Sequence, residues 1–199
     1  MKKLSLFFLL AGTLLKISAT AQGVGIGTTT PKAAFNVAEN KTVLFGRDTI
    51  GGGGKMMWIP SKYAFRAGVI GNLPVYNGNP ADGNIWDYDS IGLFSFAAGY
   101  QNKASSAGSI AIGALNQSSG ITAIALGQSN IVSGLYSFSA GVNNVTSGSA
   151  STTIGSQNKT YNDNATAIGR YNIAKGEGST AIGYGAQANS YVSIALGLY

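Results

Sequence analysis

Cysteine and histidine are both missing from this sequence of 199 residues. The lack of cysteine excludes disulfides, thiol chemistry and a lipidated amino-terminal Cys. The lack of histidine removes the commonest general base and the commonest metal ligand. Serines are abundant, but none has an identifiable base beside it in the sequence. We therefore predict that the protein is not an enzyme and that it uses no cofactor and no metal ion.

Charged residues are also scarce, at 10% of the chain. Three of the thirteen basic residues, Lys2, Lys3 and Lys16, lie in a leader segment, and the other ten against seven acids leave a net charge of +3. No basic track with interleaved aromatics is present, so nucleic acid is not an expected partner. A composition low in charge and rich in Gly, Ser and Asn also occurs in low-complexity segments, but the apolar content of 45% and a strict repeat argue against disorder.

What the sequence does contain is a five-residue phrase, small–apolar–small–apolar–Gly, which returns every 14 residues without insertion or deletion. The phrases begin at Ser95, Ser109, Ala123, Ser137, Ser151, Ala165, Ser179 and Ser193. They end at the glycines Gly99, Gly113, Gly127, Gly141, Gly155, Gly169, Gly183 and Gly197, which we assign as structural repeat residues.

A period of 14 residues suits one coil of a parallel β-solenoid, in which the phrase forms a short strand. The rest of each coil must turn twice and supply a second strand. Asn recurs three residues after the phrase glycine from Asn102 to Asn172, and Gly or a small polar residue follows four positions later. Both residue types tolerate left-handed backbone angles, so we predict that they form the two corners.

The parity of the phrase predicts which side chains face inward. Its third position is always Ala, Ser or Thr, whereas bulk is concentrated at the second and fourth positions, which point the opposite way in a strand. If the small residues line a thin interior, the bulky ones form an outer apolar stripe, which a soluble monomer would leave exposed. We predict that this stripe is the seam of a homotrimer, since closed symmetry would bury it. The predicted seam residues are Ile110, Ile112, Ile124, Leu126, Ile154, Ile168, Ile182, Ile194 and Leu196.

Phrases such as Ser109-Ile-Ala-Ile-Gly113 and Ser179-Thr-Ala-Ile-Gly183 resemble the head repeats of YadA-type trimeric autotransporter adhesins. The resemblance covers residues 95–199 with eight copies in phase. It implies an all-β fold, a left-handed parallel β-roll with 14-residue coils, three chains assembled side by side, and an adhesive role at the cell surface. It implies no catalytic residues.

The amino terminus reads as a signal peptide over residues 1–21, because a basic start is followed by a short apolar core and by small residues at Ala19 and Ala21. The alternative is a membrane anchor, but Lys16 interrupts a core already short for a span. We expect a secreted protein, at the cell surface or associated with the outer membrane, with no transmembrane anchor in the chain.

Residues 22–94 are predicted to form a small irregular capping region before the repeat domain, 95–199. We expect a strand at 42–45, a short helix at 61–68 and a long loop at 72–90. Trp58 and Trp86 are predicted to plug the first coil, since an open solenoid end would expose strand edges.

The string of glycines from Gly23 to Gly27 lacks the spacing and context of a phosphate-binding turn, so we interpret it as extended lead-in chain. Residues 24–37 resemble the amino-terminal motif of secreted tail-fibre-like proteins of Bacteroidetes-type bacteria. Those proteins often continue into adhesin-like repeats and end in an intramolecular chaperone domain.

Two possible ion or ligand sites remain open alternatives. Asp82, Asp87 and Asp89 could gather around Ca²⁺, but their spacing matches no standard calcium loop, which favours a solvated acidic turn. The Asn series could bind ions or glycans, although stacked turn residues are the simpler interpretation.

The function predicted from the sequence is polyvalent attachment by a surface-exposed, adhesin-like protein, with extracellular matrix proteins or glycans as candidate ligands. One alternative is an ice-binding or glycan-binding solenoid, because Thr152, Thr166 and Thr180 share one position in successive coils. Another is a fragment of a tail-fibre-like protein.

Overall fold

The computed structural model describes residues 23–46, 48–71 and 84–197, and the predicted signal peptide lies outside them. The chain divides into two compact units, residues 1–39 and 40–199. In the first unit, β1 (Val24–Ile26) pairs in parallel with β2 (Phe35–Val37). The glycine string thus lies in extended chain, as its sequence indicates.

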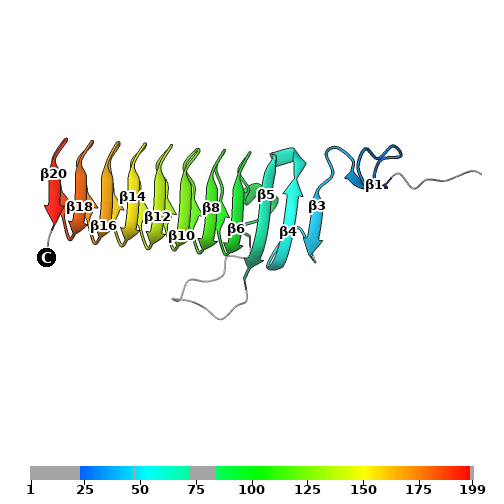
Figure 1. Cartoon of the computed structure of the whole chain (residues 1–199), viewed down its shortest axis with the longest axis horizontal. Helices are drawn as coiled ribbons and strands as arrows, with labels where there is room; N and C mark the ends of the chain where they lie inside the picture. The colour runs from blue at the N-terminus through cyan, green and yellow to red at the C-terminus, as the bar shows by residue number, and fades with distance from the viewer. Residues whose placement is uncertain (1–22, 47, 72–83, 198–199) are drawn as a thin grey trace, which may run out of the picture. The chain divides into compact units, whose positions relative to one another are not determined.

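The second unit contains the repeat array, in which every complete coil has one long and one short strand (Figure 1). The long strands are β6 (Phe96–Tyr100), β8 (Ile110–Ala114), β10 (Ile124–Gln128), β12 (Phe138–Val142), β14 (Thr152–Ser156), β16 (Thr166–Arg170), β18 (Thr180–Tyr184) and β20 (Ile194–Gly197). The short strands are β7 (Lys103–Ala104), β9 (Gln117–Ser118), β11 (Ile131–Val132), β13 (Val145–Thr146), β15 (Lys159–Thr160), β17 (Ile173–Ala174) and β19 (Gln187–Ala188).

These strands form two parallel sheets, one of long and one of short strands. Each residue pairs with the residue 14 positions later, as Ile110 does with Ile124 and Gln117 with Ile131. The predicted all-β parallel solenoid with 14-residue coils is therefore confirmed.

Small residues fill the space between the two sheets, as the parity predicts. The third phrase position is fully buried at Ala97, Ala111 and Ala125, and the second residue of each short strand is buried opposite it. Where the long strands carry Thr153 instead of Ala, hydroxyl groups pair across the interior: Thr146 Oγ1 donates to Thr153 Oγ1 at 2.7 Å. An interior this thin leaves no room for two bulky residues at one level.

The first corner differs from the prediction. The left-handed residue is not the asparagine but the residue before it, with φ of 53° to 60° from Gln101 to Tyr171. Each asparagine turns inward and is fully buried. Asn130 Nδ2, for example, donates to Asn116 Oδ1 (3.0 Å), Leu126 O (2.9 Å) and Gly141 O (2.8 Å). The series is therefore a stacked amide ladder that satisfies buried main-chain carbonyls.

The second corner also differs. The left-handed residue lies two positions after the small residue, for example Thr122 (φ 53°) after Gly120 and Tyr136 (φ 56°) after Gly134. Glycine is favoured here by close approach between coils, because a Cβ on Gly134 would lie 2.0 Å from Gly148 O. The residue types alone do not identify the left-handed residue of either corner. An Asn can be required for a buried hydrogen bond, and a Gly for close approach between coils, as well as for a left-handed backbone.

The amino-terminal cap is more regular than its sequence indicates. Strands β3 (Val43–Gly46), β4 (Gly53–Ile59) and β5 (Ala64–Ile70) extend the sheet of long strands, and the 3-10 turns η1 (Pro60–Lys62) and η2 (Tyr88–Ser90) complete it. The predicted strand at 42–45 is confirmed within one residue. The predicted helix at 61–68 is wrong: β5 pairs in parallel with β6, and this pairing overrides the local helix signals at Ser61 and Gly68.

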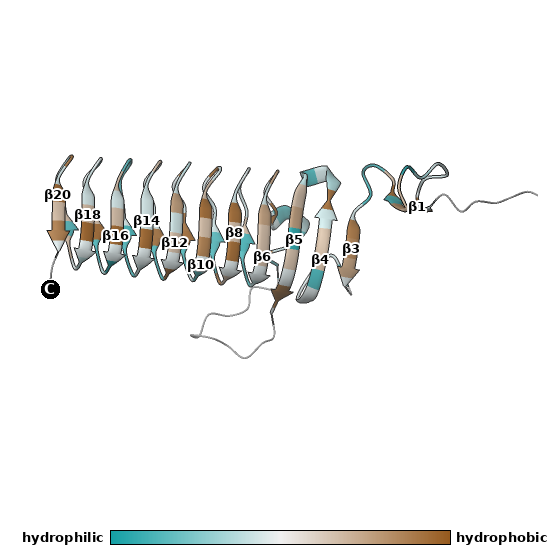
Figure 2. Cartoon of the chain, viewed as in Figure 1, coloured by the Kyte–Doolittle hydropathy of each residue, from teal (hydrophilic) through white to brown (hydrophobic). Residues whose placement is uncertain are grey.

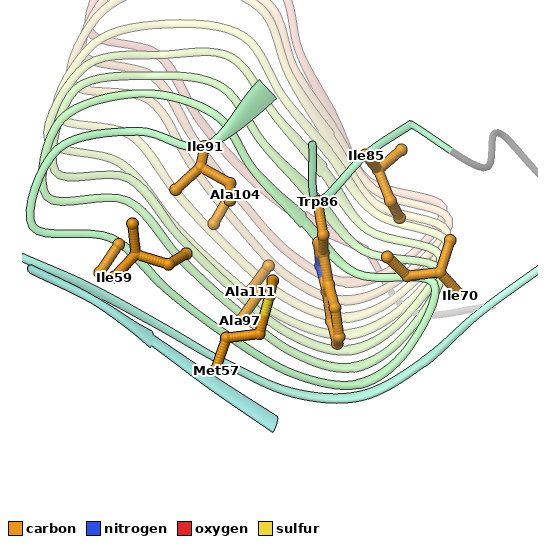
Figure 3. Close-up of a cluster of buried hydrophobic side chains, with 10 residues drawn as sticks. Met57, Ile59, Ile70, Ile85, Trp86, Ile91, Ala97, Ala104 and Ala111 are labelled. Carbon is orange, nitrogen blue, oxygen red and sulfur yellow. The ribbon is translucent and has the colours of Figure 1, made fainter. Parts of the chain in front are cut away.

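A cluster of large side chains closes the bore of the solenoid at the cap (Figure 3). Trp86 is 1% exposed and stands among Met57, Ile70 and Ile85. The plug predicted for Trp86 is thus confirmed. Trp58 lies on the opposite face of β4 and is 40% exposed, so its predicted role in the plug is wrong.

Candidate functional site

The bulky phrase residues lie on the outer face of the sheet of long strands, in two straight columns. Strand register aligns the second position of each phrase from Phe96 to Ile194 and the fourth position from Ala98 to Leu196. Brown bands on long strands such as β8, β10 and β14 mark this apolar face in Figure 2. One wall of the array therefore carries two outward columns that are mainly apolar and that include Thr152, Thr166 and Thr180 in the second position.

Bulk is balanced between the two columns. Where the second position is Phe, at Phe96 and Phe138, the fourth is Ala, at Ala98 and Ala140. At Ile124, by contrast, the fourth position is Leu126. Phe at the second position is thus offset by Ala at the fourth in both of these coils, whereas the coils that begin at Ser151, Ala165 and Ser179 carry Thr at the second position and Ile at the fourth.

All nine predicted seam residues lie on this face. Ile110, Ile124, Leu126 and Ile168 are half-buried, and Ile112, Ile154 and Ile182 are 38% to 40% exposed. Ile194 and Leu196 reach 74% and 78% because β20 is the edge strand of its sheet. Their role as a trimer seam remains a prediction.

The repeat glycines serve close contact between coils. Seven of them, from Gly99 to Gly183, have φ between 109° and 120°. A Cβ on Gly127 would lie 2.2 Å from Gly141 O in the next coil. Any other residue would therefore have both a strained backbone and a clash, which accounts for glycine at this phase.

Two basic side chains are buried in the cap. Arg66 occupies the inward position that Ala97 takes in the next strand, and it is fully buried. Its guanidinium donates to Phe65 O (2.8 Å), Ser95 O (3.1 Å), Ser95 Oγ (2.7 Å) and Ala104 O (2.9 Å). Burial lowers the pKa of Arg66 to about 10, so the side chain remains protonated at neutral pH.

Lys55 holds the glycine-rich loop between β3 and β4. Its Nζ donates to Ile50 O (3.1 Å) and Gly51 O (2.9 Å), and burial lowers its pKa although Asp87 and Asp48 oppose that shift. Asp87 accepts a hydrogen bond from Gly51 N at 2.9 Å. A small apolar cavity of about 130 Å³ lies between this loop and Trp86.

Of the three carboxylates weighed as an alternative calcium site, only those of Asp87 and Asp89 lie in the described residues. Asp87 holds the loop main chain, Asp89 lies in η2, and Asp82 falls outside the described residues. Across residues 23–46, 48–71 and 84–197, no group of three or more acidic side chains is arranged to hold a metal ion. The Asn ladder is buried and hydrogen-bonded internally, so it offers no surface to ions or glycans.

The threonines considered for ice binding do stack directly. Thr152 pairs with Thr166 and Thr166 with Thr180, all half-buried. They continue the second-position column of the apolar face, where Phe138 precedes them and Ile194 follows. A column of only three threonines within an otherwise apolar column is weak support for ice binding.

Sequence analysis missed a groove on the opposite wall, over the short strands β15, β17 and β19. Its volume is about 460 Å³. Tyr161, Asn162, Ile173, Lys175, Gln187 and Asn189 line it. The signal was present in the sequence, since Tyr161, Lys175 and Asn189 stand where the four earlier coils have serine.

Within the described ranges, the structure has no helix long and apolar enough to cross a membrane. A comparison with curated proteins finds no match to the chain. The family model for the YadA head domain repeat (2 copies) matches residues 90–116, 118–144, 147–172 and 174–199. These matches cover more than half of the chain and coincide with the coils described above. By this repeat and by its β-solenoid fold, the chain belongs to the family of proteins that carry YadA head domain repeats.

Proposed function

We propose that this adhesin-like protein is secreted, is displayed at the cell surface, and works as a homotrimeric β-roll that attaches the cell to extracellular matrix proteins or glycans. The observation that carries the proposal is the pair of apolar columns on one wall of the array. A family of head repeats with adhesive members supports a structural and binding role rather than a catalytic one.

The trimer follows from the geometry of that wall. Side chains such as Ile112 and Ile154 already have more than half of their surface buried within one chain, and their remainder faces outward along a straight line. Burying the remainder of one such side chain contributes about 1 kcal/mol, roughly half the value for a fully buried aliphatic residue. Three copies around one axis would bury the columns of all three chains at once. The assembly would also be closed, so that no further chains could add to it.

Attachment through such an assembly is polyvalent for two reasons. Three identical chains present the same outer wall, and within each chain successive coils repeat much of their surface. Because the binding sites are linked, many contacts of low affinity together give strong attachment, and no single site of high affinity is needed.

The first experiment measures the mass of the purified full chain in solution by multi-angle light scattering, with circular dichroism on the same sample. We expect a β-rich particle of three chains. Ile112→Asn places three amides on the axis and is expected to weaken the trimer. Ile131→Asn is the matched control, because Ile131 is 43% exposed, close to the 40% of Ile112, but lies on the wall of short strands.

A folded wild-type monomer would contradict the trimer. Equal weakening by both substitutions would show that the apolar columns are not the seam. Attachment is then measured by binding of the chain to surfaces coated with matrix proteins or glycans, and failure on every surface would contradict the adhesive role.

A further inference from the structure

The groove over β15, β17 and β19 lies on the wall that faces away from the apolar columns. The inward residues of these strands, Thr160, Ala174 and Ala188, are buried, so their neighbours Lys159, Ile173 and Gln187 point outward. The groove therefore stays open when the apolar wall is covered.

The side chains around this groove are not required by the fold. Ser105, Ser119, Ser133 and Ser147 occupy the position of Tyr161 in the earlier coils. The backbone is the same in both cases: Ser133 N donates to Thr146 O at 2.9 Å, and Tyr161 N donates to Ala174 O at 3.1 Å. The solenoid thus forms equally well with serine, and the change to Tyr, Lys and Asn in three successive coils needs another explanation.

Polar groups in the groove are available to a ligand. In the described part of the chain, no residue forms a hydrogen bond with the side chains of Lys175, Gln187 or Asn189. Asn162, by contrast, donates from Nδ2 to Lys175 O at 2.7 Å and fixes the backbone beneath. Tyr161 is 43% exposed.

The charge of the groove is positive. Lys175 lines it, and Lys159 lies outside the lining, next to the groove, where it pairs with the lining residue Ile173 in the neighbouring strand. No acidic side chain contributes to the lining. Of the two acids in the array, Asp163 accepts a hydrogen bond from Ser149 N at 2.8 Å, and Glu177 lies beyond the corner that follows Lys175. The groove therefore favours an anionic ligand.

We infer that this groove binds an acidic glycan, a chain of sugars that carry carboxylate or sulfate groups. Tyr161 provides an aromatic face for the C–H side of one sugar ring, Lys175 and Lys159 pair with the anionic groups, and the amides of Gln187 and Asn189 bind hydroxyls. Neighbouring strands lie about 4.8 Å apart, so successive side chains are spaced on the scale of one pyranose unit.

A glycan fits this surface better than an extended peptide. The main-chain groups of β15 and β17 are engaged by the strands on both sides, so the free edge of this sheet is confined to β19. What the groove presents is a ring, several hydrogen-bond donors and positive charge, which is the chemistry of sugar recognition.

The inference rests on the proposed adhesive function for its biological use, but the groove lies within one chain. A monomer should therefore bind the glycan too. A result that contradicts the trimer proposal can thus be distinguished from a result that contradicts the glycan site. Binding at the groove should depend on a few named residues, chiefly Tyr161 and Lys175.

The test uses isothermal titration of the full chain with α-1,4-linked trigalacturonic acid, which carries carboxylates, and with a heparin tetrasaccharide, which adds sulfates. Maltotriose is the neutral counterpart. Tyr161→Ser and Lys175→Ser restore the serine of the earlier coils and should preserve the fold. Each is expected to weaken binding of an acidic oligosaccharide about tenfold, the size of one lost charge-assisted or stacking contact. Lys103→Gln is the matched control, because it removes a lysine from the same wall far from the groove and copies Gln117.

Equal loss in Lys103→Gln and Lys175→Ser would overturn the proposal, since binding would then reflect net charge alone. Equal binding of maltotriose would overturn its anionic part, and no binding of either acidic probe would overturn it entirely. A readout without substitutions is acylation of lysines followed by mass spectrometry. Trigalacturonic acid or the heparin fragment should protect Lys159 and Lys175 but not Lys103, and the absence of this difference would also contradict the site.

Discussion

Trp86 donates its indole Nε1–H to the main-chain carbonyl of Asn102 at 2.7 Å. Asn102 is the first member of the buried amide ladder, and its Oδ1 accepts hydrogen bonds from both N and Nδ2 of Asn116 at 3.0 Å. The side-chain cluster that plugs the bore is therefore hydrogen-bonded directly to the first residue of the amide ladder. The cap closes the array both by apolar contact and by satisfying a buried carbonyl that would otherwise face the open end.

We expect Trp86→Ala to lower the free energy of unfolding by about 4 kcal/mol, since it leaves a large cavity and an unsatisfied carbonyl. Trp58→Ala is the matched control and should stay within about 1 kcal/mol, because Trp58 is exposed. Urea denaturation followed by circular dichroism, at one fixed protein concentration, measures both. Similar losses in the two variants would show that Trp86 is not the plug.

Asn130→Ala should cost about 3 kcal/mol or more, because it removes a buried amide that serves Asn116, Leu126 O and Gly141 O together. Asn189→Ala, at an exposed position, is expected to change stability by less than about 0.5 kcal/mol. The same denaturation assay compares them. A small effect of Asn130→Ala would mean that water replaces the ladder.

Gly127→Ala should destabilise the protein by more than about 4 kcal/mol, because backbone strain and a clash with the next coil act together. In Gly185→Ala the φ of 70° is strained as well, but a Cβ there would meet nothing within 4 Å, so the expected cost is about 1 kcal/mol. The difference between the two free energies of unfolding reports the contact between coils together with the greater backbone strain at φ 109°. Equal costs would assign the whole effect to backbone conformation.

Two replacements of Arg66 separate the contribution of its charge to stability from the contribution of its side-chain volume. Arg66→Met should remain within about 1 kcal/mol of wild type, because the acceptors Ser95 O and Ala104 O keep hydrogen bonds from Phe65 N and Gly92 N, and an apolar side chain avoids burial of a charge. Arg66→Ala should cost about 3 kcal/mol through the cavity that it leaves. A large loss in Arg66→Met would show that the guanidinium hydrogen bonds themselves hold the cap.

Several features of the fold were predictable because they depend on alternation along one strand. The 14-residue period sets the register of every coil. Ala, Ser or Thr at the third position identifies the strand face that points into the narrow interior. The outer position of residues such as Ile112 and Leu126 follows from the same alternation, without any knowledge of the partner strand.

Other features could not be read from local pattern. Ser61 and Gly68 favour a helix by themselves, but the exposed edge of β6 pairs with the segment between them and makes it a strand. The roles of the two tryptophans differ only by the face of the sheet on which each lies. The corner asparagines looked like conformational residues, whereas the packing of one coil on the next turns them into buried hydrogen-bonding groups.

The sequence by itself determined the repeat, its parity and the apolar stripe, because side-chain direction in a strand alternates with a period of two whatever the partner is. The tertiary structure decided which residue takes the left-handed corner, how the bore is closed, and that Tyr161, Lys175 and Asn189 meet around one groove. These outcomes depend on contacts between residues one coil or more apart, and the stacking of coils brings such residues together only once the chain has folded.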